Sequence, residues 1–507
     1  MGCQCAQPDG NVIVVPMTPI EEIQNKLTEF ESLKEQGTLI ADVAGELARH
    51  AVELVFDHFQ AGDGCLREAV HLICQIATDE TPEIARTGIN ALFPQLVERL
   101  NDSFDPAACQ LYDQLFAQVI EFCRRLPEGG RLDEGLNQFG LLSEADLLSR
   151  KSKLQNSKPG SSTPHSQFSI PQKVLLLSRV TIGADVAVTS SIIAKLRQAF
   201  PQAEFVILGS RKLRELYGGD DRIRISEIAY ERGGSLIARL TSWLDVVAAI
   251  NKEREGFGKD DVWVIDPDSR LTQLGLLPLV EKDHNYFFFE SRSYKPNNNS
   301  NSIGQLAASW CGELIGNHEP SYPFIALPTE HLEFGKFVAN QIRNPQFAIH
   351  NLTAISFGVG GNQSKRISAE FEQQQIEQLL AESKIILDKG ATPEERDQVN
   401  RIVAGVRAQG KAVVELCGAN QTQAVSGELQ VADIVTWDGS IGAFAGLIAA
   451  SDQYIGYDSA GQHIAAALGV PTLTFFVNSN NATFAERWRP FGKGRLQVVQ
   501  VESGQPK

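Results

Sequence analysis

From residue 173 onward, the sequence alternates short apolar runs with longer amphipathic stretches. Lys173–Ser178 and Glu204–Leu208 are apolar runs, and Asp185–Phe200 between them has helical periodicity. Short buried strands separated by helices predict right-handed crossover connections, which build a parallel sheet covered by helices. The same pattern restarts at Ala354–Phe357. We therefore predict an α/β fold with two doubly wound domains of similar size, which implies a cleft between them.

The alternation also predicts the individual elements of these two domains. Further strands are predicted at Ile223–Ile225, Val262–Ile265, Tyr286–Phe289, Lys384–Leu387, Ala412–Leu416 and Gln453–Gly456. Helices are predicted at Ser235–Ile250, Ser368–Ala381, Ile441–Ala450 and from Pro393 onward. Thr392 and Glu395 form a capping-box pattern at the start of the last of these helices. The two domains are predicted over residues 171–340 and 341–507.

The first 150 residues have a different pattern, because their apolar residues recur at helical spacing. Thr18 and Glu21 flank Pro19 as a helix start signal. Gly88 weakens a later predicted helix, and Pro94 is expected to bend or end it. We predict an all-α domain of five or six helices.

Charge divides the chain in the same way. Residues 1–150 hold 25 Asp and Glu against 10 Lys and Arg, a net charge of −15, whereas the remaining residues hold 37 against 36. An acidic surface repels nucleic acid and anionic lipid, so we expect neither as a partner of this segment. Oligomerisation or docking to a protein partner is the expected role. Residues 151–170, rich in Ser, Pro and Gly, are predicted to be a flexible linker.

Several classes of protein are not favoured by the sequence. No apolar run approaches the length of a membrane span, and the amino terminus lacks the pattern of a secretory signal. We expect a cytoplasmic protein, either free or peripheral at the inner face of the membrane. The eight cysteines include no C-x-x-C pair or zinc spacing, and no cluster of histidine and cysteine suggests a metal site, so no metal or cofactor is expected.

A candidate ligand site lies near the carboxyl end, within Tyr454–Leu473. This stretch predicts a short strand, a turn over Asp458–Gly461, and a helix over Gln462–Leu468 that ends at Gly469. Ser459 and Gln462 have the spacing of a capping box. The free amides and the dipole of the helix start favour an anion such as a phosphate. His463 points into the same site, although an ordinary histidine near a helix start is the alternative.

Two distant stretches resemble one family of enzymes. Lys173–Ser191 is similar to the amino-terminal signature of the heptosyltransferase-like glycosyltransferases, glycosyltransferase family 9, and Asp458–His463 is similar to their nucleotide-sugar signature. Gly360–Arg366 matches the place where the family has a lysine for the phosphates, and Arg487–Pro490 also fits. The resemblance covers about residues 173–501.

The chain departs from the family pattern at single positions. Ala184 and Ala460 stand where the family has glycine, and Ser191 stands where it has proline. These departures suggest a divergent branch of the family, so the substrate is left open.

The resemblance implies a GT-B fold with two Rossmann-like domains and an inverting, metal-independent transfer of a sugar. The donor would be a nucleotide-diphosphate sugar, with ADP-heptose as one candidate. The acceptor would be a hydroxyl of a lipopolysaccharide core, another lipid-linked glycan, a protein or a small glycoside. The catalytic base implied by the family is Asp185. The donor-binding residues implied are Lys365, Arg366, Asp458, Ser459, Ala460, Gly461 and His463. Candidates for acceptor binding are Arg179, Asp266 and Arg270.

The residues alone leave alternatives open. Asp185 at a helix start is also typical of an acid that stabilises the helix dipole. Asp266 before a proline is equally typical of a turn, and Lys365 and Arg366 are each equally typical of a solvated surface. A nucleotide-sugar-binding assembly subunit without activity, or a sugar-nucleotide epimerase on the same fold, are the competing functions.

Overall fold

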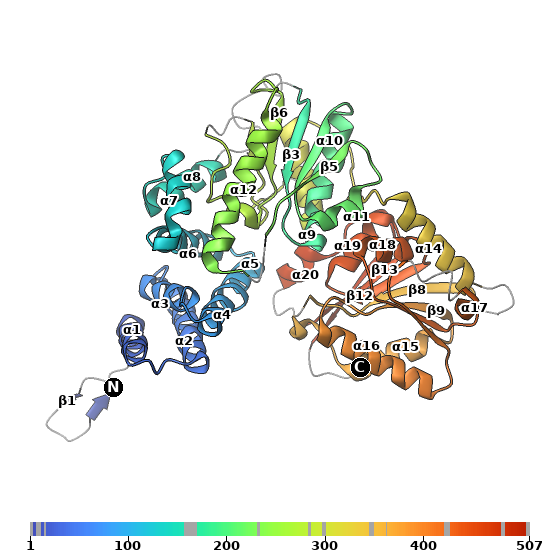
Figure 1. The fold of residues 1–507 in the computed structure, drawn as a ribbon, viewed down its shortest axis with the longest axis horizontal. Helices are drawn as coiled ribbons and strands as arrows, with labels where there is room; N and C mark the ends of the chain where they lie inside the picture. The colour runs from blue at the N-terminus through green and yellow to red at the C-terminus, as the bar shows by residue number, and fades with distance from the viewer. Residues whose placement is uncertain are drawn as a thin grey trace. The chain divides into compact units, whose positions relative to one another are not determined.

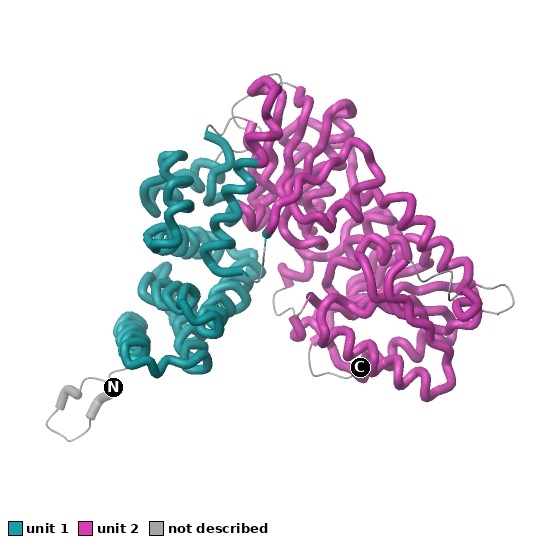
Figure 2. The backbone as a smooth tube through the Cα atoms, in the orientation of Figure 1, with its two compact units in different colours: residues 1–156, 230–248, 272–281 teal, residues 157–229, 249–271, 282–507 magenta. Residues whose placement is uncertain are grey.

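The structure is a computed structural model (Figure 1). It describes residues 4–6, 12–14, 17–156, 170–230, 234–281, 285–296, 301–343, 349–360, 362–419, 426–477 and 482–502. The chain forms two compact units, coloured separately in Figure 2. The first unit comprises residues 1–156, 230–248 and 272–281, and the second comprises residues 157–229, 249–271 and 282–507.

The first unit is built mainly from helices. Its helices are α1 (Pro19–Glu35), α2 (Ala41–Gln60), α3 (Arg67–Ala77), α4 (Pro82–Asn90), α5 (Glu98–Ser103), α6 (Pro106–Arg124), α7 (Gly130–Gln138) and α8 (Glu144–Asn156). These outnumber the five or six predicted. Two short antiparallel strands, β1 (Gln4–Ala6) and β2 (Val12–Val14), precede them.

The predicted start of α1 is confirmed. The Thr18 hydroxyl accepts a hydrogen bond from the amide of Glu21, and the Glu21 carboxylate accepts one from the amide of Thr18 at 2.9 Å. These two bonds satisfy amides that a helix start otherwise leaves without a partner.

Gly88 and Pro94 both shape the middle of the first unit. A side chain at Gly88 would overlap the backbone of Ala77, so the glycine allows α4 to pack closely on α3. Pro94 lies within η1, a π-helical turn over Ala91–Val97 that follows α4. The expected end of the helix therefore takes the form of a wider turn, because proline cannot donate the regular backbone bond.

Segments from beyond the predicted helical domain complete the core of the first unit. Trp243 is buried within this unit, its ring centroid 5.7 Å from that of Phe139, and its indole N–H donates to the carbonyl of Pro278. Trp243 belongs to α12 (Leu236–Arg254), of which residues 249–254 belong to the second unit. The predicted linker also starts within α8, and residues 157–169 lie outside the described residues.

The second unit contains two parallel sheets. The first has the order β5-β4-β3-β6-β7, with β3 Lys173–Leu177, β4 Glu204–Gly209, β5 Ile223–Glu227, β6 Val262–Asp266 and β7 Tyr286–Phe288. The second has the order β10-β11-β9-β8-β12-β13-β14, with β8 Asn351–Ser356, β9 Ser383–Asp388, β10 Val413–Leu416, β11 Ile434–Trp437, β12 Gln453–Tyr457, β13 Thr472–Val477 and β14 Leu496–Val501. The predicted α/β fold with two doubly wound sheets is confirmed, and β11 and β14 are strands that the sequence did not predict.

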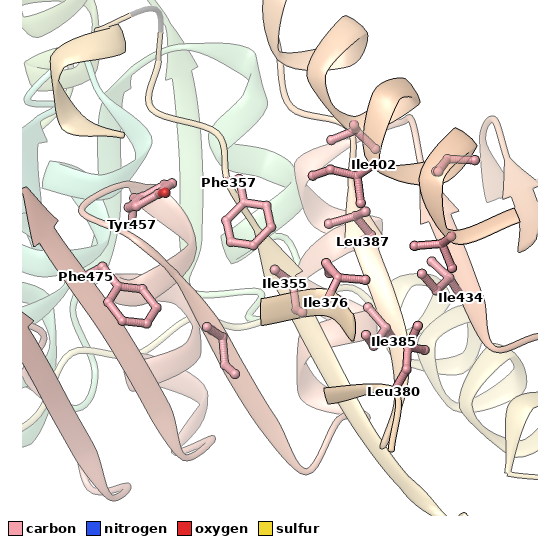
Figure 3. Packing of buried hydrophobic residues seen from close by; sticks show 14 of the residues in the cluster. Ile355, Phe357, Ile376, Leu380, Ile385, Leu387, Ile402, Ile434, Tyr457 and Phe475 are labelled. Carbon is pink, nitrogen blue, oxygen red and sulfur yellow. The ribbon is translucent and has the colours of Figure 1, made fainter. Parts of the chain in front are cut away.

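Helices cover both faces of the seven-stranded sheet (Figure 1). On one face lie α15 (Ala369–Leu379) and α16 (Pro393–Ala408), and on the other lie α14 (Thr329–Ile342), α18 (Ile441–Ala449) and α19 (Ala460–Leu468). Figure 3 shows the core beneath α15 and α16, where Ile376 and Ile402 pack against Ile355, Ile385 and Leu387 of the sheet. The remaining helices of the unit are α9 (Ile182–Ala184), α10 (Ser190–Ala199), α11 (Arg214–Tyr217), α13 (Ile303–Ile315), α17 (Ser426–Leu429) and α20 (Ala482–Trp488). No helix in the described ranges has the length and apolar character needed to cross a membrane.

Two glycines allow α14 to lie directly on α18. A side chain at Gly446 would overlap the carbonyl oxygen of His331, and one at Gly335 would overlap the carbonyl oxygen of Gly446. The predicted boundary between residues 340 and 341 falls near the end of α14. The packing on α18 associates this helix with the seven-stranded sheet.

We predict that Gly446→Val destabilises the second unit. The added side chain has no space against backbone atoms of α14, and overpacking of this kind costs about 1–3 kcal/mol. Denaturant unfolding followed by tryptophan fluorescence measures the change, because Trp437 lies 5.2 Å from the ring of Phe334 in α14. Gly427→Ala is the control, since nothing lies within 4 Å of its added Cβ. Equal loss of stability in both variants would contradict the packing described.

Candidate functional site

The strand order of the five-stranded sheet reverses between β3 and β6. Ligands of open α/β sheets bind outside the carboxyl ends of the strands at such a point. The segment after β3 carries Arg179 and Asp185, Asp266 is the last residue of β6, and the segment after β6 carries Arg270. Four residues selected from the sequence therefore lie at the end of, or after, the two strands at which the topology places a ligand.

The seven-stranded sheet has its own reversal, between β8 and β12. Lys365 and Arg366 follow β8, and the Asp458–His463 segment follows β12. The candidate donor-binding residues thus come from the two loops that border this second switch point.

Asp185 is buried, with 2% of its surface exposed, and three donors bind its carboxylate. The Ser178 hydroxyl donates to Oδ2 at 2.6 Å, and the Arg179 amide and the Thr189 hydroxyl donate to Oδ1 at 2.7 and 3.0 Å. Two of these donors belong to the loop after β3. The carboxylate therefore fixes this loop to the helix that follows.

The loop that Asp185 holds has a strained backbone. Val180 has φ of 75°, a conformation that β-branched residues rarely adopt. Its amide donates to the Ser178 hydroxyl at 2.9 Å, and that hydroxyl donates in turn to Asp185. Asp185 also begins the π-helical turn η4 (Asp185–Thr189) between α9 and α10. Strained residues and π-helical turns both occur often at functional sites.

Burial raises the pKa of Asp185 to about 6, although its three hydrogen bonds and the charge of Arg179 act in the opposite direction. Removal of a carboxylate from water disfavours its charged form. At neutral pH the group is still mostly ionised, and it is a stronger base than an aspartate in water.

The start of α19 differs from the sequence prediction. Ser459 occupies the N-cap position, but its side chain makes no capping hydrogen bond. The predicted capping box of Ser459 and Gln462 is therefore wrong. The Gln462 amide group instead donates to Asp458 Oδ1 at 2.7 Å and to the carbonyl of Trp488 at 3.3 Å. A charged carboxylate is a stronger acceptor than the groups of the helix start, which explains the choice.

Lys365 and Asp458 form an ion pair across the switch point. Lys365 Nζ donates to Asp458 Oδ2 at 2.7 Å, with the lysine side chain 28% exposed. Gln462 binds the other carboxylate oxygen. The structure thus pairs Lys365, which was expected to bind the donor phosphates, with Asp458 of the nucleotide-sugar signature.

His463 is buried beside this pair. Burial lowers its pKa to about 4, while Asp458 raises it and Lys365 lowers it further. The imidazole is therefore neutral at pH 7, with one nitrogen that donates and one that accepts hydrogen bonds. Its ring lies edge-on to that of Trp488, with centroids 6.1 Å apart.

Gly183 connects the two sequence signatures. A Cβ added there would lie 3.2 Å from the Cα of Ala460 and 3.4 Å from a ring carbon of His463. The helical segment that contains Asp185 therefore packs against the start of α19. Gly461, also at this start, has no room for a side chain, since a Cβ there would overlap the hydroxyl of Tyr454.

The remaining candidates have structural partners. Nε and Nη2 of Arg366 donate to the buried carboxylate of Glu372, so Arg366 is not a solvated surface residue. Asp266 is 0% exposed and accepts hydrogen bonds from the amide of Ser269 and the hydroxyl of Tyr286, at 2.7 and 2.9 Å. This arrangement favours the turn interpretation of Asp266.

The two arginine candidates for acceptor binding lie closer to the surface. Arg179 is half-buried, donates to the carbonyl of Pro267 at 2.9 Å and lies 6.0 Å from the ring centroid of Trp488. Arg270 is half-buried in the short turn η6 (Arg270–Thr272). Its positive charge contributes to lowering the pKa of Arg179.

Sequence reasoning missed two groups that organise the site. Ser178 and Thr189 bind Asp185, and no motif distinguished them from other hydroxyl residues. Glu395 was predicted only as a capping-box acid, yet its carboxylate accepts bonds from the amides of Val359, Gly360, Ala391 and Thr392. Burial opposes its ionisation, but these amides hold the pKa of Glu395 below its ordinary value. It therefore fixes the loop that leads to Lys365.

Across the described ranges, no group of three or more His, Cys, Asp or Glu side chains is placed to hold a metal ion.

We predict that Asp185 makes stability depend on pH in a specific direction. Its pKa is higher in the folded chain than the ordinary 3.8. Its contribution is therefore most favourable below pH 3.8 and is lost as the pH rises through about 6, by about 3 kcal/mol in total.

The measurement compares the unfolding free energy of the wild type and of Asp185→Asn between pH 4 and pH 7. The wild type should lose stability relative to the variant as the pH rises. A difference that stays constant over this range would show that burial does not raise the pKa of Asp185.

Residues 374–507 match the sequence profile of glycosyltransferase family 9 (heptosyltransferase). No curated protein sequence matches the chain.

Several solved structures resemble the chain at low identity. A glycosyltransferase family 9 protein from Veillonella parvula has 15% identity and a TM-score of 0.45, over 66% of this chain and 87% of that one. E. coli ADP-heptose lps heptosyltransferase II has 15% identity and a TM-score of 0.41, over 65% and 90%. E. coli heptosyltransferase WaaC with ADP has 15% identity and a TM-score of 0.42, over 65% and 93%.

The profile match agrees with the resemblance that the Asp458–His463 motif indicated, and the two parallel sheets are consistent with it. Residues 374–507 are thus similar to glycosyltransferase family 9 (heptosyltransferase).

Proposed function

We propose that the chain transfers a sugar from a nucleotide-diphosphate sugar to a hydroxyl acceptor, with inversion at the anomeric carbon and without a metal ion. The observation that carries this proposal is the packing of Gly183 against Ala460 and His463. It brings the helical segment of Asp185 next to the start of α19. A base and a site for the leaving group are thereby adjacent.

The donor diphosphate binds at the start of α19 in this proposal. The backbone amides of Ala460 and Gly461 and the helix dipole favour an anion, and the Ser459 side chain does not occupy them as a cap. Lys365 exchanges its ion pair with Asp458 for one with the phosphates. These groups supply the positive charge that a divalent ion provides in other transferases.

Once Lys365 has moved, Asp458 is free to accept hydrogen bonds from sugar hydroxyls through Oδ2. Gln462 still holds its other oxygen and keeps the carboxylate in place. The neutral ring of His463 adds a hydrogen bond to a phosphate or sugar oxygen without placing a further charge in the site.

Asp185 acts as the base. The acceptor oxygen forms a bond to the anomeric carbon while the bond to the diphosphate oxygen breaks, and the acceptor proton passes to Asp185. A pKa of about 6 suits a base that works near neutral pH. Because Asp185 is buried, the strained loop at Val180 shifts to admit the acceptor. A single displacement inverts the anomeric centre.

The donor sugar that we propose is a heptose. Support comes from the description of the matching family, which names heptosyltransferases. ADP-heptose is therefore the first donor to test, and a lipopolysaccharide core the first acceptor. Arg179 and Arg270 provide positive charge for an acceptor that carries anionic groups.

A second candidate function is nucleotide-sugar binding without transfer. It is favoured by the three hydrogen bonds that occupy the Asp185 carboxylate and by its burial. In this case Asp185 serves only to fix the loop after β3. The acidic helical segment would then dock the subunit to a protein partner.

We predict that Lys365→Ala weakens binding of the nucleotide-diphosphate donor by about 10- to 100-fold, because a charged hydrogen bond to phosphate is lost. Titration calorimetry with ADP-heptose and with ADP measures the effect. Arg343→Ala is the matched control. Arg343 is 29% exposed and pairs with Asp452 at 2.9 Å, much as Lys365 pairs with Asp458. Equal weakening in both variants would contradict the donor site.

We predict that Asp185→Asn lowers the rate of transfer by about 10²- to 10⁴-fold, as expected for loss of a general base, and leaves donor affinity nearly unchanged. The wild-type rate should rise with pH through about 6, where Asp185 loses its proton. Mass spectrometry of products, with a lipopolysaccharide core as acceptor, measures both effects. Transfer by the variant at the wild-type rate would remove Asp185 as the base. Donor binding without any transfer by the wild type would favour the second candidate.

A further inference from the structure

A cavity of about 480 Å³ lies in the second unit beside α13. Gln305, Ser309 and Glu313 of α13 line it, and their spacing of four residues places them along one face of the helix. Tyr322 and Phe491 line it as well. Its volume falls within the range of about 300–1,000 Å³ that is typical of small-molecule pockets.

The two aromatic residues form a continuous apolar surface. The ring centroids of Tyr322 and Phe491 are 5.2 Å apart and the ring planes differ by 34°. Both side chains are half-buried, and Lys493 Nζ lies 5.6 Å from the centroid of Tyr322. The face of an aromatic ring carries partial negative charge. It therefore attracts the weakly positive C–H groups on one side of a sugar ring.

The other lining residues suit a ligand rich in hydroxyl groups. Gln305, Ser309 and Glu313 lie on successive turns of α13. The Gln305 side-chain oxygen accepts hydrogen bonds from Ser302 at the helix start, so its amide N–H groups are the part that can donate to a ligand hydroxyl. The Glu313 carboxylate can accept a hydrogen bond from a ligand hydroxyl.

Ser321 is a second, independent indication of a polar ligand. It lines the cavity, is 7% exposed, and its Oγ has no hydrogen-bond partner among the described residues. A buried hydroxyl without a partner is unfavourable, and a ligand hydroxyl would satisfy it.

The charges around the cavity do not suit an anion. Two carboxylates, Glu313 and Glu319, line it. The buried Lys195, which also lines it, donates through Nζ to the carbonyl oxygen of Glu319. These two carboxylates balance the positive charges of Lys195 and of Lys493 beside Tyr322, so a phosphate or carboxylate ligand would gain no net attraction. An apolar ligand would leave several polar groups without partners. A neutral saccharide satisfies both the aromatic and the polar walls.

The position of the cavity relates it to the transfer site. A Cβ added at Gly304, near the start of α13, would lie 2.8 Å from the carbonyl oxygen of Ala187 and 3.3 Å from Phe491. Ala187 belongs to the same π-helical turn as Asp185. We propose that the cavity binds a neutral saccharide unit of the glycan acceptor, at a distance from the hydroxyl that reacts. This inference rests on the proposed function for the role of the saccharide, whereas saccharide binding itself is tested separately.

The test uses the full chain, without nucleotide, and a panel of neutral sugars: glucose, galactose, mannose, lactose and maltose. Saturation-transfer NMR detects binding and gives affinities. We expect at least one sugar to bind the wild type. Tyr322→Ala should weaken it about tenfold through loss of the aromatic surface, and Ser321→Ala by several fold. Phe257→Ala is the control, since Phe257 is 36% exposed and does not line the cavity.

Three outcomes would overturn the proposal. They are the absence of binding to the wild type, equal binding by wild type, Tyr322→Ala and Ser321→Ala, and displacement of the sugar by inorganic phosphate. Because Ser321→Ala removes only one oxygen atom, it keeps the test valid if Tyr322→Ala does not fold.

Binding of ADP by the same samples separates this inference from the proposed function. Sugar binding without ADP binding would support the cavity as a saccharide site and remove its role in transfer. ADP binding without sugar binding would overturn the cavity alone. With an active wild type, Tyr322→Ala should raise the KM for the glycan acceptor about tenfold and leave kcat and the donor KM unchanged. An unchanged acceptor KM would overturn the assignment to the acceptor.

Discussion

The buried carboxylate of Asp185 is the interaction on which the candidate site depends. Its hydrogen bonds to Ser178 and to the amide of Arg179 hold the loop after β3 in a conformation that includes the strained Val180. The Ser269 hydroxyl and the Arg179 guanidinium add bonds between this loop and the segment after β6. Burial raises the pKa of the carboxylate to about 6, and the bonds that hold the loop oppose this rise. The basicity of Asp185 therefore comes from its burial, and the loop geometry from its hydrogen bonds.

Close approach at glycines determines how the second unit is assembled around this loop. Gly183 lets the segment before Asp185 touch Ala460 and His463, and Gly335 and Gly446 let α14 lie on α18. In each case a larger side chain would separate elements that are distant in sequence. The two sequence signatures can thus lie side by side because Gly183 has no side chain.

The sequence predicted most of the strands and helices, because apolar periodicity and start signals such as Thr18 and Thr392 are local. It failed where a side chain has a choice of nearby partners. Gln462 donates to Asp458, four residues before it, and not to Ser459, because a charged carboxylate is the stronger acceptor. Arg366 pairs with Glu372, six residues after it, and nothing in the sequence distinguished this acid from its neighbours. The topology of the sheets explains why Lys365 and Asp458 meet, since both follow strands at a switch point, but no spacing in the sequence indicates that they pair.

The first unit is assembled from three segments that are separated in the chain. Trp243 and Pro278 belong to its core although they lie far beyond the acidic helices in the chain. A fragment that ends near Asn156 would lack these residues. A fragment that begins there would lack Phe139, which packs against the buried indole ring of Trp243. Segments of the first unit thus alternate along the chain with segments of the second unit, so the first unit cannot be exchanged between proteins as a terminal module.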